Sequence, residues 1–214
     1  MCGISGIYSF TDTAESFVPC VEKSIQTLRN RGPEVQRVEC TGRVALAHAR
    51  LAILDTSSAG NQPFTDASGR YTIIYNGEFY NYRDYYAELR ADGVNFTSSS
   101  DTEVLLYLYI KYRQCCLEKI NGFFAFAVYD SVENTLFVAR DRMGIKPLYF
   151  IQTEQFFGFS SELKGILEFP FERKLNNNAL FAYLQFMYVP APMTMVQGVE
   201  KLEPGMSLFV SPSG

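Results

Sequence analysis

The chain begins with the segment Met1-Cys2-Gly3-Ile4-Ser5-Gly6-Ile7-Tyr8-Ser9-Phe10, which predicts a β-strand that starts at the very first residues. Aminopeptidases remove an initiator methionine when a small residue follows it. Loss of Met1 leaves Cys2 with a thiol and a free α-amine of reference pKa about 7.7–8.0, and such an amine can activate a nucleophile without a histidine. Cys2 is therefore a candidate nucleophile, the alternative being an N-terminal residue without a chemical role.

The rest of the chain predicts short elements of both kinds. Apolar spacing and flanking turn residues predict helices at 14–29, 82–91, 101–112, 162–167 and 178–186. Strands are predicted at 44–54, 71–75, 123–129, 136–140, 148–152, 156–160 and 207–210. Because the helices are grouped rather than strictly alternating with the strands, we expect an α+β fold with antiparallel sheets and helices packed outside them.

Composition argues against several classes of function. With 47% hydrophobic and 20% charged residues, the 214-residue chain fits one large globular domain. A net charge of −4 gives no reason to expect nucleic acid. No apolar run reaches the length of a membrane span and no secretory signal is evident, so the cytoplasm is the expected location. Five unevenly spaced cysteines and a single histidine predict neither a disulfide framework nor a metal site.

Several polar residues are candidates for binding or catalysis. Asn76 and Gly77 follow the strand predicted at 71–75, where a side-chain amide and a backbone N–H can form an oxyanion hole, although spacing alone favours a hairpin turn. Arg50 lies within an apolar run and needs a partner, either a substrate carboxylate or an internal acid. Asp101 begins a predicted helix, where a plain N-cap is favoured over contact with a substrate ammonium.

His48 is the single histidine, and we expect it to be a core residue on a strand rather than the partner of Cys2 in a Cys–His dyad. The sequence contains no GxGxxG, GxxxxGK[ST] or GxSxG motif. No nucleotide-binding loop and no serine nucleophile elbow are therefore predicted.

Segments along nearly the whole chain together resemble the class II (N-terminal nucleophile) glutamine amidotransferases, and within them the asparagine synthetase type. The segments that carry the resemblance follow the family's order: 2–7 (CGISGI), 31–33 (RGP), 47–55 (AHARLAILD), 60–63 (GNQP), 75–82 (YNGEFYNY), 100–103 (SDTE), 121–127 (NGFFAFA), 139–149 (ARDRMGIKPLY), 160–164 (SSELK) and 199–205 (VEKLEPG). So many ordered matches make the resemblance highly specific.

The resemblance implies a fold and a catalytic set. The fold is a four-layer αββα sandwich, the N-terminal nucleophile hydrolase fold, in which two antiparallel sheets lie between helical layers. Cys2 would attack the side-chain amide of glutamine and form a γ-glutamyl thioester, while its own α-amine moves protons. Asn76 and Gly77 would stabilise the oxyanion, and the products would be glutamate and ammonia.

The resemblance also implies how glutamine is bound. Arg50 would bind the α-carboxylate, and Asp101 and Glu78 would contact the α-ammonium. Leu51 and Ile53 would line the same pocket through their backbone. No metal and no cofactor are expected within this domain.

The resemblance makes 1–214 a glutaminase domain, with 190–214 leading toward a C-terminal synthetase domain. The chain ends at Ser211-Pro212-Ser213-Gly214, just after a predicted strand, so we expect that domain to be missing here. It would use ATP and Mg²⁺, and its Ser-Gly-Gly-x-Asp-Ser loop does not occur in this sequence. The expected partners are glutamine, the synthetase domain and a second copy in a homodimer, with no nucleic acid and no membrane.

Departures from the family pattern bear on the ammonia acceptor. The usual His-Arg-Gly-Pro-Asp is replaced by Asn30-Arg31-Gly32-Pro33-Glu34, and Arg37 stands where a glycine is common. Three hypotheses therefore stay open: the glutaminase of an asparagine synthetase, the same glutaminase serving a different amide or amino acceptor, and a non-catalytic regulatory lobe.

Overall fold

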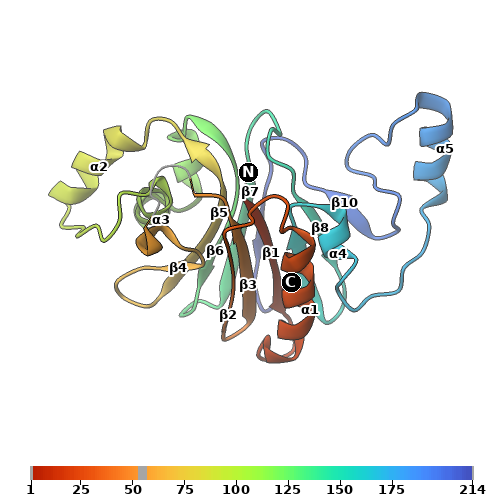
Figure 1. Cartoon of the computed structure of the whole chain (residues 1–214), viewed down its shortest axis with the longest axis horizontal. Coiled ribbons are helices and arrows are strands. Elements are labelled where there is room, and N and C mark those ends of the chain that lie inside the picture. The colour runs from red at the N-terminus through yellow and green to blue at the C-terminus, as the bar shows by residue number, and fades with distance from the viewer. Residues whose placement is uncertain (1, 53–56, 214) are drawn as a thin grey trace.

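Two antiparallel sheets face each other in the computed structural model, which describes residues 2–52 and 57–213 (Figure 1). The first sheet has the strand order β10 (Val199–Lys201), β8 (Tyr149–Gln152), β9 (Phe156–Ser160), β1 (Gly3–Ser9), β3 (Val44–Arg50), β2 (Val35–Thr41). The second has the order β11 (Ser207–Val210), β7 (Thr135–Arg140), β6 (Gly122–Asp130), β5 (Tyr71–Phe79), β4 (Phe64–Thr65). Every neighbouring pair is antiparallel, as expected from the sequence.

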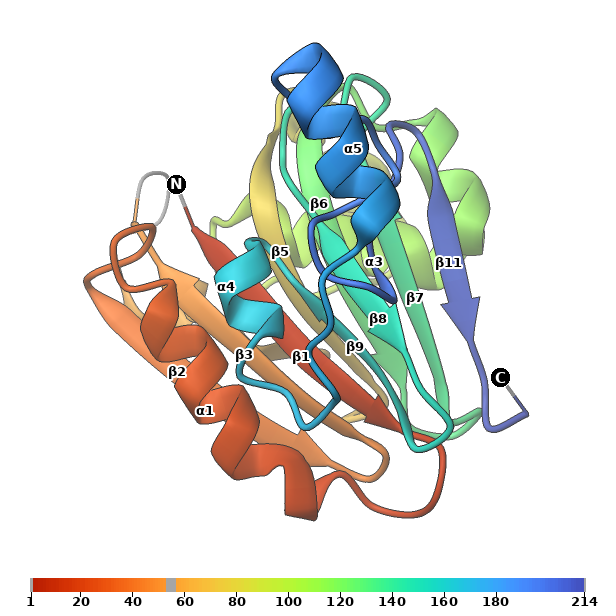
Figure 2. The same ribbon diagram turned by 90° about the vertical axis from the view of Figure 1, so that its right-hand side faces the viewer.

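Helices cover the outer faces of both sheets. The first sheet is covered by α1 (Val18–Thr27) and α4 (Leu163–Ile166). The second is covered by α3 (Asp101–Tyr112), against which α2 (Tyr82–Ala91) packs (Figures 1 and 2). The predicted four-layer αββα sandwich is thus confirmed. A further helix, α5 (Asn177–Phe186), projects at the side of the first sheet (Figure 1). Short 3₁₀ turns complete the helical elements at Glu15–Phe17, Ser58–Gly60 and Arg113–Glu118.

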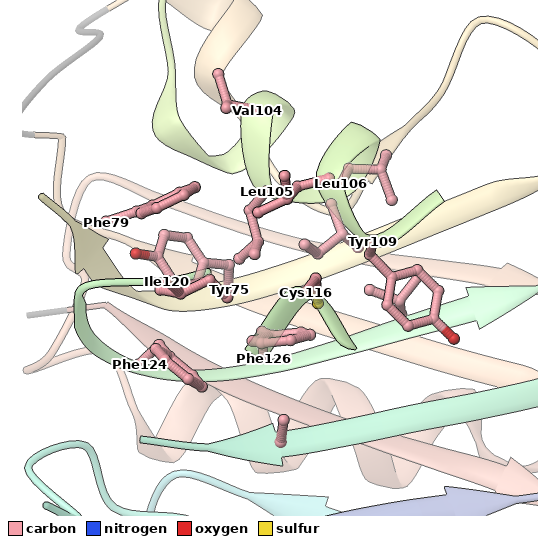
Figure 3. Close-up of a cluster of buried hydrophobic side chains, with 14 of the residues drawn as sticks. Tyr75, Phe79, Val104, Leu105, Leu106, Tyr109, Cys116, Ile120, Phe124 and Phe126 are labelled. Carbon is pink, nitrogen blue, oxygen red and sulfur yellow. The ribbon is translucent and has the colours of Figure 1, made fainter. Parts of the chain in front are cut away.

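Three apolar cores separate the four layers. One lies between the second sheet and its helices, where Tyr75 and Phe126 meet Leu105 of α3 (Figure 3). A second lies between the two sheets, and a third lies between the first sheet and α1 and α4. Aromatic side chains fill much of all three, since seven of the 18 Phe residues and several Tyr residues are buried strand residues. The sheets are therefore held at both faces.

The alternation of side chains along β1 and β5 places Cys2 and Asn76 on the faces that line the core between the sheets. Ile4 of β1 and Ile74 of β5 belong to the core between the sheets. Residues two positions apart on a strand face the same side. Cys2 and Asn76 are two residues away from these core residues, so their side chains point into the same inter-sheet space.

One predicted turn is wrong. β5 does not end at Tyr75 but continues to Phe79, so that Asn76 and Gly77 pair with Ala125 and Phe124 of β6. An Asn-Gly pair permits a hairpin turn. Here the neighbouring strand β6 is long enough to pair with β5 through both residues, so β5 continues as a strand. The oxyanion-hole candidates therefore sit within a rigid strand.

The predicted helix cap at Asp101 is also wrong. Ser100 is the N-cap of α3, and its hydroxyl accepts a hydrogen bond from the Thr102 N–H over 3.1 Å. Asp101 is the first residue of the helix, and its carboxylate is left to accept other donors. β3 also ends earlier than predicted, at Arg50, and the strands β2, β4 and β10 were not predicted.

Neither a membrane-spanning helix nor a cluster suited to a metal ion occurs within residues 2–52 and 57–213. No helix in these ranges is both long and apolar enough to cross a bilayer. No group of three or more His, Cys, Asp or Glu side chains in the same ranges is arranged to hold a metal.

Candidate active site

A cavity of 320 Å³ lies where the start of β1, the end of β3, the last part of β5 and the first turn of α3 meet. This volume suits a small molecule. The residues that were predicted for the site and that line the cavity are Cys2, Arg50, Leu51, Asn76, Gly77, Glu78 and Asp101. Ile53 lies outside the described residues, so its role stays a prediction.

Cys2 is held through both its backbone and its sulfur. The Arg31 side chain donates from Nε to the Cys2 carbonyl over 2.9 Å, and its Nη1 forms an ion pair with Glu162 Oε1 over 2.9 Å. The Leu51 N–H points at Cys2 Sγ over 3.4 Å. Burial raises the pKa of the Cys2 thiol, and the Leu51 N–H and nearby positive charges oppose that rise. Because the thiolate is the nucleophile, the thiol needs a base before it can attack.

Gly32 brings the Arg31 loop against β3. A Cβ atom at position 32 would lie 2.2 Å from the Ala49 carbonyl oxygen and 2.5 Å from the Arg50 nitrogen. Both distances are far inside van der Waals contact, so only glycine permits this close approach. The Arg31 side chain reaches the Cys2 carbonyl from this position.

Asn76 has a buried side-chain amide without a partner. The residue is 1% exposed, and within residues 2–52 and 57–213 neither its Oδ1 nor its Nδ2 takes part in a hydrogen bond. A buried polar group left unpaired costs about 1–3 kcal/mol, and such groups are rare in folded proteins. Since Asn76 lines the same cavity as Cys2, its Nδ2 can donate to an oxyanion formed when the sulfur attacks a carbonyl.

The backbone N–H of Gly77 points toward the same cavity. In an antiparallel ladder the N–H groups of alternate residues point to the same edge of the strand. The Tyr75 N–H donates to Gln62 Oε1 over 2.6 Å and the Phe79 N–H donates to Asp101 Oδ2 over 3.0 Å, and neither acceptor belongs to β6. Gly77 lies midway between them, and β4 pairs with β5 only before this point. The Gly77 N–H is therefore a second donor at this uncovered edge of β5.

Gly77 also leaves room for the Tyr75 ring. A Cβ atom at position 77 would lie 2.5 Å from Tyr75 Cε2 and 2.4 Å from the Phe123 carbonyl oxygen. The Tyr75 hydroxyl donates to Asp101 Oδ2 over 3.2 Å. A side chain at position 77 would thus displace the ring that helps to hold Asp101.

Asp101 is a buried carboxylate at the cavity wall. Burial raises its pKa to about 6, the Phe79 N–H lowers it, and the neighbouring Glu78 charge raises it further. The carboxylate is mostly ionised at neutral pH, yet it carries an unfavourable burial cost. A cation that entered the cavity would offset this cost.

Arg50 supplies a positive charge in the same cavity. The residue is 7% exposed, and its Nη1 donates to the Ser57 carbonyl and to Asn61 Oδ1, each over 2.7 Å. Arg50 and Asp101 therefore place a guanidinium and a carboxylate in one cavity, which suits the two charged groups of a free α-amino acid.

His48 lines the cavity as a neutral core residue. It is 1% exposed, and its Nε2 lies 3.2 Å from the Tyr75 carbonyl oxygen, to which the ring donates. Complete burial lowers the pKa of His48 to about 3, so the ring is uncharged at neutral pH. The prediction of a core histidine is confirmed. No hydrogen bond within the described ranges joins His48 to Cys2, which disfavours the Cys–His dyad.

Gln62 and Lys146 are among the buried cavity residues that were not predicted for the site, as are Tyr75, Ser100 and Thr102. Gln62 ties β5 to α3, because its Oε1 accepts from Tyr75 and its Nε2 donates to Thr102 Oγ1 over 3.1 Å. Lys146 is 5% exposed, and it also lines the cavity. Both stand in segments that carried the family resemblance, but their spacing along the chain gave no sign that they would meet Cys2 in space.

The comparison with protein families bears directly on this site. The family described as glutamine amidotransferase domain matches residues 1–214. The chain belongs to this family. The amidotransferase domain is thus identified over the same residues that form the sandwich and its cavity.

Curated relatives share the whole of this domain but are much longer. The chain is 38% identical, over 218 residues, to asparagine synthetase [glutamine-hydrolyzing] 3 of Bacillus subtilis (strain 168), covering 100% of the chain and 35% of that protein. It is 34% identical, over 224 residues, to amidase chry2 of Gibberella zeae, covering 100% of the chain and 33% of that protein. The chain therefore spans about a third of the length of these relatives.

Two solved structures of other proteins show the same fold. The glutamine phosphoribosylpyrophosphate amidotransferase from B. subtilis, complexed with ADP and GMP, matches all of the chain and 48% of its own length, with a TM-score of 0.68 at 21% identity. The structure titled as the allosteric regulatory enzyme of purine biosynthesis matches all of the chain and 48% of its own length, with a TM-score of 0.70 at 19% identity. At such low identity the likeness concerns the fold alone.

Proposed function

We propose that this amidotransferase domain hydrolyses glutamine to glutamate and ammonia, with Cys2 as the nucleophile once Met1 has been removed. The observation that carries the proposal is the buried, unpartnered amide of Asn76 in the cavity that also holds the Cys2 sulfur. A fold that leaves such a group unpaired beside a thiol is suited to stabilise a tetrahedral oxyanion.

The reaction follows from the groups that line the cavity. The α-amine of Cys2 takes the thiol proton, and the sulfur attacks the γ-carbonyl carbon of glutamine. Negative charge develops on the carbonyl oxygen, where the Asn76 side chain and the Gly77 N–H donate. Collapse of this intermediate breaks the C–N bond, and the amine returns its proton to the leaving nitrogen as ammonia. Water then hydrolyses the thioester, which gives glutamate and restores the thiol.

The charged groups of the cavity suit the backbone end of glutamine. Arg50 would bind the α-carboxylate, and Asp101 together with Glu78 would bind the α-ammonium. The ammonium offsets the burial cost that raises the pKa of Asp101. Leu51 and Ile53 would complete the pocket through their backbone.

The destination of the ammonia is a proposal about the longer protein. Residues 1–214 would act as the glutaminase half, with 190–214 leading to a synthetase domain that uses ATP and Mg²⁺. The relative from B. subtilis is named an asparagine synthetase and that from Gibberella zeae an amidase, so aspartate and a different acceptor are both supported by relatives of similar identity. The cytoplasm, which keeps thiols reduced, suits the five free cysteines within the described ranges. A homodimer stays a prediction.

The test labels the nucleophile with a glutamine-like alkylating inhibitor. We expect the N-terminal peptide to lack Met1 and to carry the label on Cys2, and we expect excess glutamine to slow labelling because both compete for one pocket. Glutamate release, measured in parallel, should fall as labelling rises. A protein that lacks Met1 but is neither labelled nor active would contradict the proposal and favour the regulatory lobe.

A further inference from the structure

Lys146 is a buried cation in the cavity wall that the reaction described above does not use. It is 5% exposed, and its Nζ lies 4.4 Å from the centre of the Phe123 ring. None of the ion pairs formed within residues 2–52 and 57–213 includes Lys146. Burying an ammonium without an acidic partner is unfavourable, and a contact with an aromatic ring offsets only part of this cost. The position of Lys146 therefore indicates a role other than stabilising the fold.

The backbone that presents Lys146 is fixed independently of its ammonium. The Lys146 N–H donates to Asp141 Oδ2 and the Ile145 N–H donates to Asp141 Oδ1, each over 2.9 Å. The Lys146 carbonyl accepts from Arg140 Nε over 2.7 Å. These bonds hold the loop between β7 and β8 without any contribution from the lysine side chain. The side chain can therefore be replaced while the loop keeps its shape.

Charges of both signs surround the Cys2 sulfur. The charged and titratable groups of the elements packed around it are Arg31 with Glu162, His48 and Arg50 of β3, Tyr75 and Glu78 of β5, Asp101 of α3, and Asp141 and Lys146 of the loop after β7. Burial raises the pKa of the Cys2 thiol, and the Leu51 N–H, Lys146 and Arg50 lower it, in that order. Burial likewise lowers the pKa of Lys146, and Cys2 and Glu78 oppose that shift.

Bound glutamine changes this balance. In the proposed complex the α-carboxylate of glutamine neutralises Arg50, so the guanidinium no longer acts on the sulfur. That arrangement assigns the two charged groups of glutamine to Arg50 and to Asp101 with Glu78, and neither of them to Lys146. It is then the side chain left to stabilise a thiolate.

We propose that the Lys146 ammonium stabilises negative charge on the Cys2 sulfur, so that Lys146 acts on the reaction through the nucleophile. Its effect on the thiol rests on the cavity that the two residues share and does not depend on the glutaminase function. Its effect on turnover rests on the proposed glutaminase function. The two effects can therefore be measured separately.

The first experiment titrates the Cys2 thiol without glutamine. Iodoacetamide alkylation is followed against pH, and the tryptic peptide 2–23 is fragmented to separate label on Cys2 from label on Cys20. In Lys146→Met we expect the Cys2 pKa to rise by about one unit, as for loss of a unit charge in a partly buried site. The alkylation rate at pH 7 should fall about threefold and not tenfold, because the thiolate of a less acidic thiol is also more nucleophilic. Lys146→Gln is the second neutral variant should the methionine variant not fold.

Matched variants separate the ammonium from general effects. Lys146→Arg keeps the charge and cannot act as a base, so its thiol pKa should stay close to that of the unchanged protein. Lys174→Met removes an exposed charge that is paired with Glu172 and does not line the cavity, and it should leave the thiol unchanged. Intact mass confirms that Met1 is processed equally in all samples.

The second experiment measures glutamine hydrolysis by the same variants. Lys146→Met should lower kcat about threefold and change KM by less than about twofold, since Lys146 acts through the sulfur and not on the charged ends of glutamine. If no protein hydrolyses glutamine but Lys146→Met raises the thiol pKa, the proposed function fails and the effect on the sulfur stands. An unchanged thiol pKa in Lys146→Met, or a pKa in Lys146→Arg raised as in the methionine variant, would overturn the inference.

Discussion

The two sheets contribute to the cavity in different ways. The groups at the ends of β1 and β3 already have partners: Cys2 is held by Arg31 and Leu51, and Arg50 donates to Ser57 and Asn61. By contrast, Asn76 of β5 is buried without any partner within the described ranges. The first sheet therefore fixes groups that are needed before the reaction, and the second keeps a donor free for charge that develops during it. This difference can be tested from both sides.

The largest effect should come from removing the nucleophile of the first sheet. Cys2→Ala should reduce glutamine hydrolysis by at least about 10⁴-fold, because no other group can form the thioester. The fold should survive, since the sulfur makes only weak contacts with Leu51. Glutamate release and the thermal unfolding midpoint are the measurements. Cys115→Ala, at an exposed cysteine, is the matched control. Activity that persists in Cys2→Ala would refute the assignment.

The next effect tests the unpartnered donor of the second sheet. Asn76→Ala should lower kcat by about 10²–10³-fold with little change in KM, since Nδ2 acts on the oxyanion and not on the bound substrate. The free energy of unfolding should be unchanged or higher, because the variant no longer buries an unpaired amide. Steady-state kinetics measures the change in kcat, and urea unfolding measures the change in the free energy of unfolding. Asn178→Ala, at an exposed asparagine, provides the comparison. A loss of stability without a loss of kcat would show that the amide is structural.

A smaller effect is expected when the charge of Arg50 is kept but its geometry is changed. Arg50→Lys should raise KM for glutamine about 10–100-fold, because an ammonium cannot bind a carboxylate in the bidentate manner of a guanidinium. The change in kcat should be several times smaller. Initial rates over a range of glutamine concentration give both constants. Arg173→Lys, at an exposed arginine, is the control. A fall in kcat at constant KM would move Arg50 from substrate binding to the chemical step.

The smallest effect concerns the loss of folding stability caused by burial of the Asp101 carboxylate. Its folded pKa of about 6 exceeds the reference value of 3.8, so between these values the folded state binds more protons and stability falls as pH rises. The variant Asp101→Asn has no ionisable group at this position, so its stability should not show this dependence on pH. At pH 7.5 it should be more stable by about 1 kcal/mol, because relief of the burial cost is partly offset by weaker hydrogen bonds to a neutral amide. Urea unfolding at pH 4.5 and 7.5, with Asp12→Asn as the exposed control, is the measurement. The expectation would be contradicted if the free energy of unfolding changed equally between the two pH values in the variant and in the unchanged protein.

The regular parts of the fold could be predicted from the sequence because their patterns are local. The strands at 123–129 and 136–140 alternate or run apolar over short lengths between turns, and both were found where expected. β2 was missed because it is an edge strand with mostly exposed polar residues, which leaves no alternating pattern. The Asn76-Gly77 turn was wrong because a long-range partner, β6, extends the ladder past a local turn signal.

The site was only partly predictable for a similar reason. The family resemblance named seven of the residues that line the cavity, but spacing alone favoured structural roles for Asn76 and Asp101. That Asn76 has no partner depends on which groups from other strands surround it, and no sequence pattern expresses this. The same holds for Lys146, whose neighbours along the chain are apolar while its neighbours in space are Cys2 and Glu78.

The uncovered edge of β5 has a consequence for self-association. A bare strand edge offers a row of N–H groups to which another chain can add as a strand, the usual beginning of edge-to-edge aggregation. Here two of three successive outward N–H groups are occupied by side chains, Tyr75 by Gln62 and Phe79 by Asp101. A foreign strand would have to displace both acceptors to pair at Gly77. The arrangement that leaves one donor open to a small molecule thus closes the edge to a polypeptide.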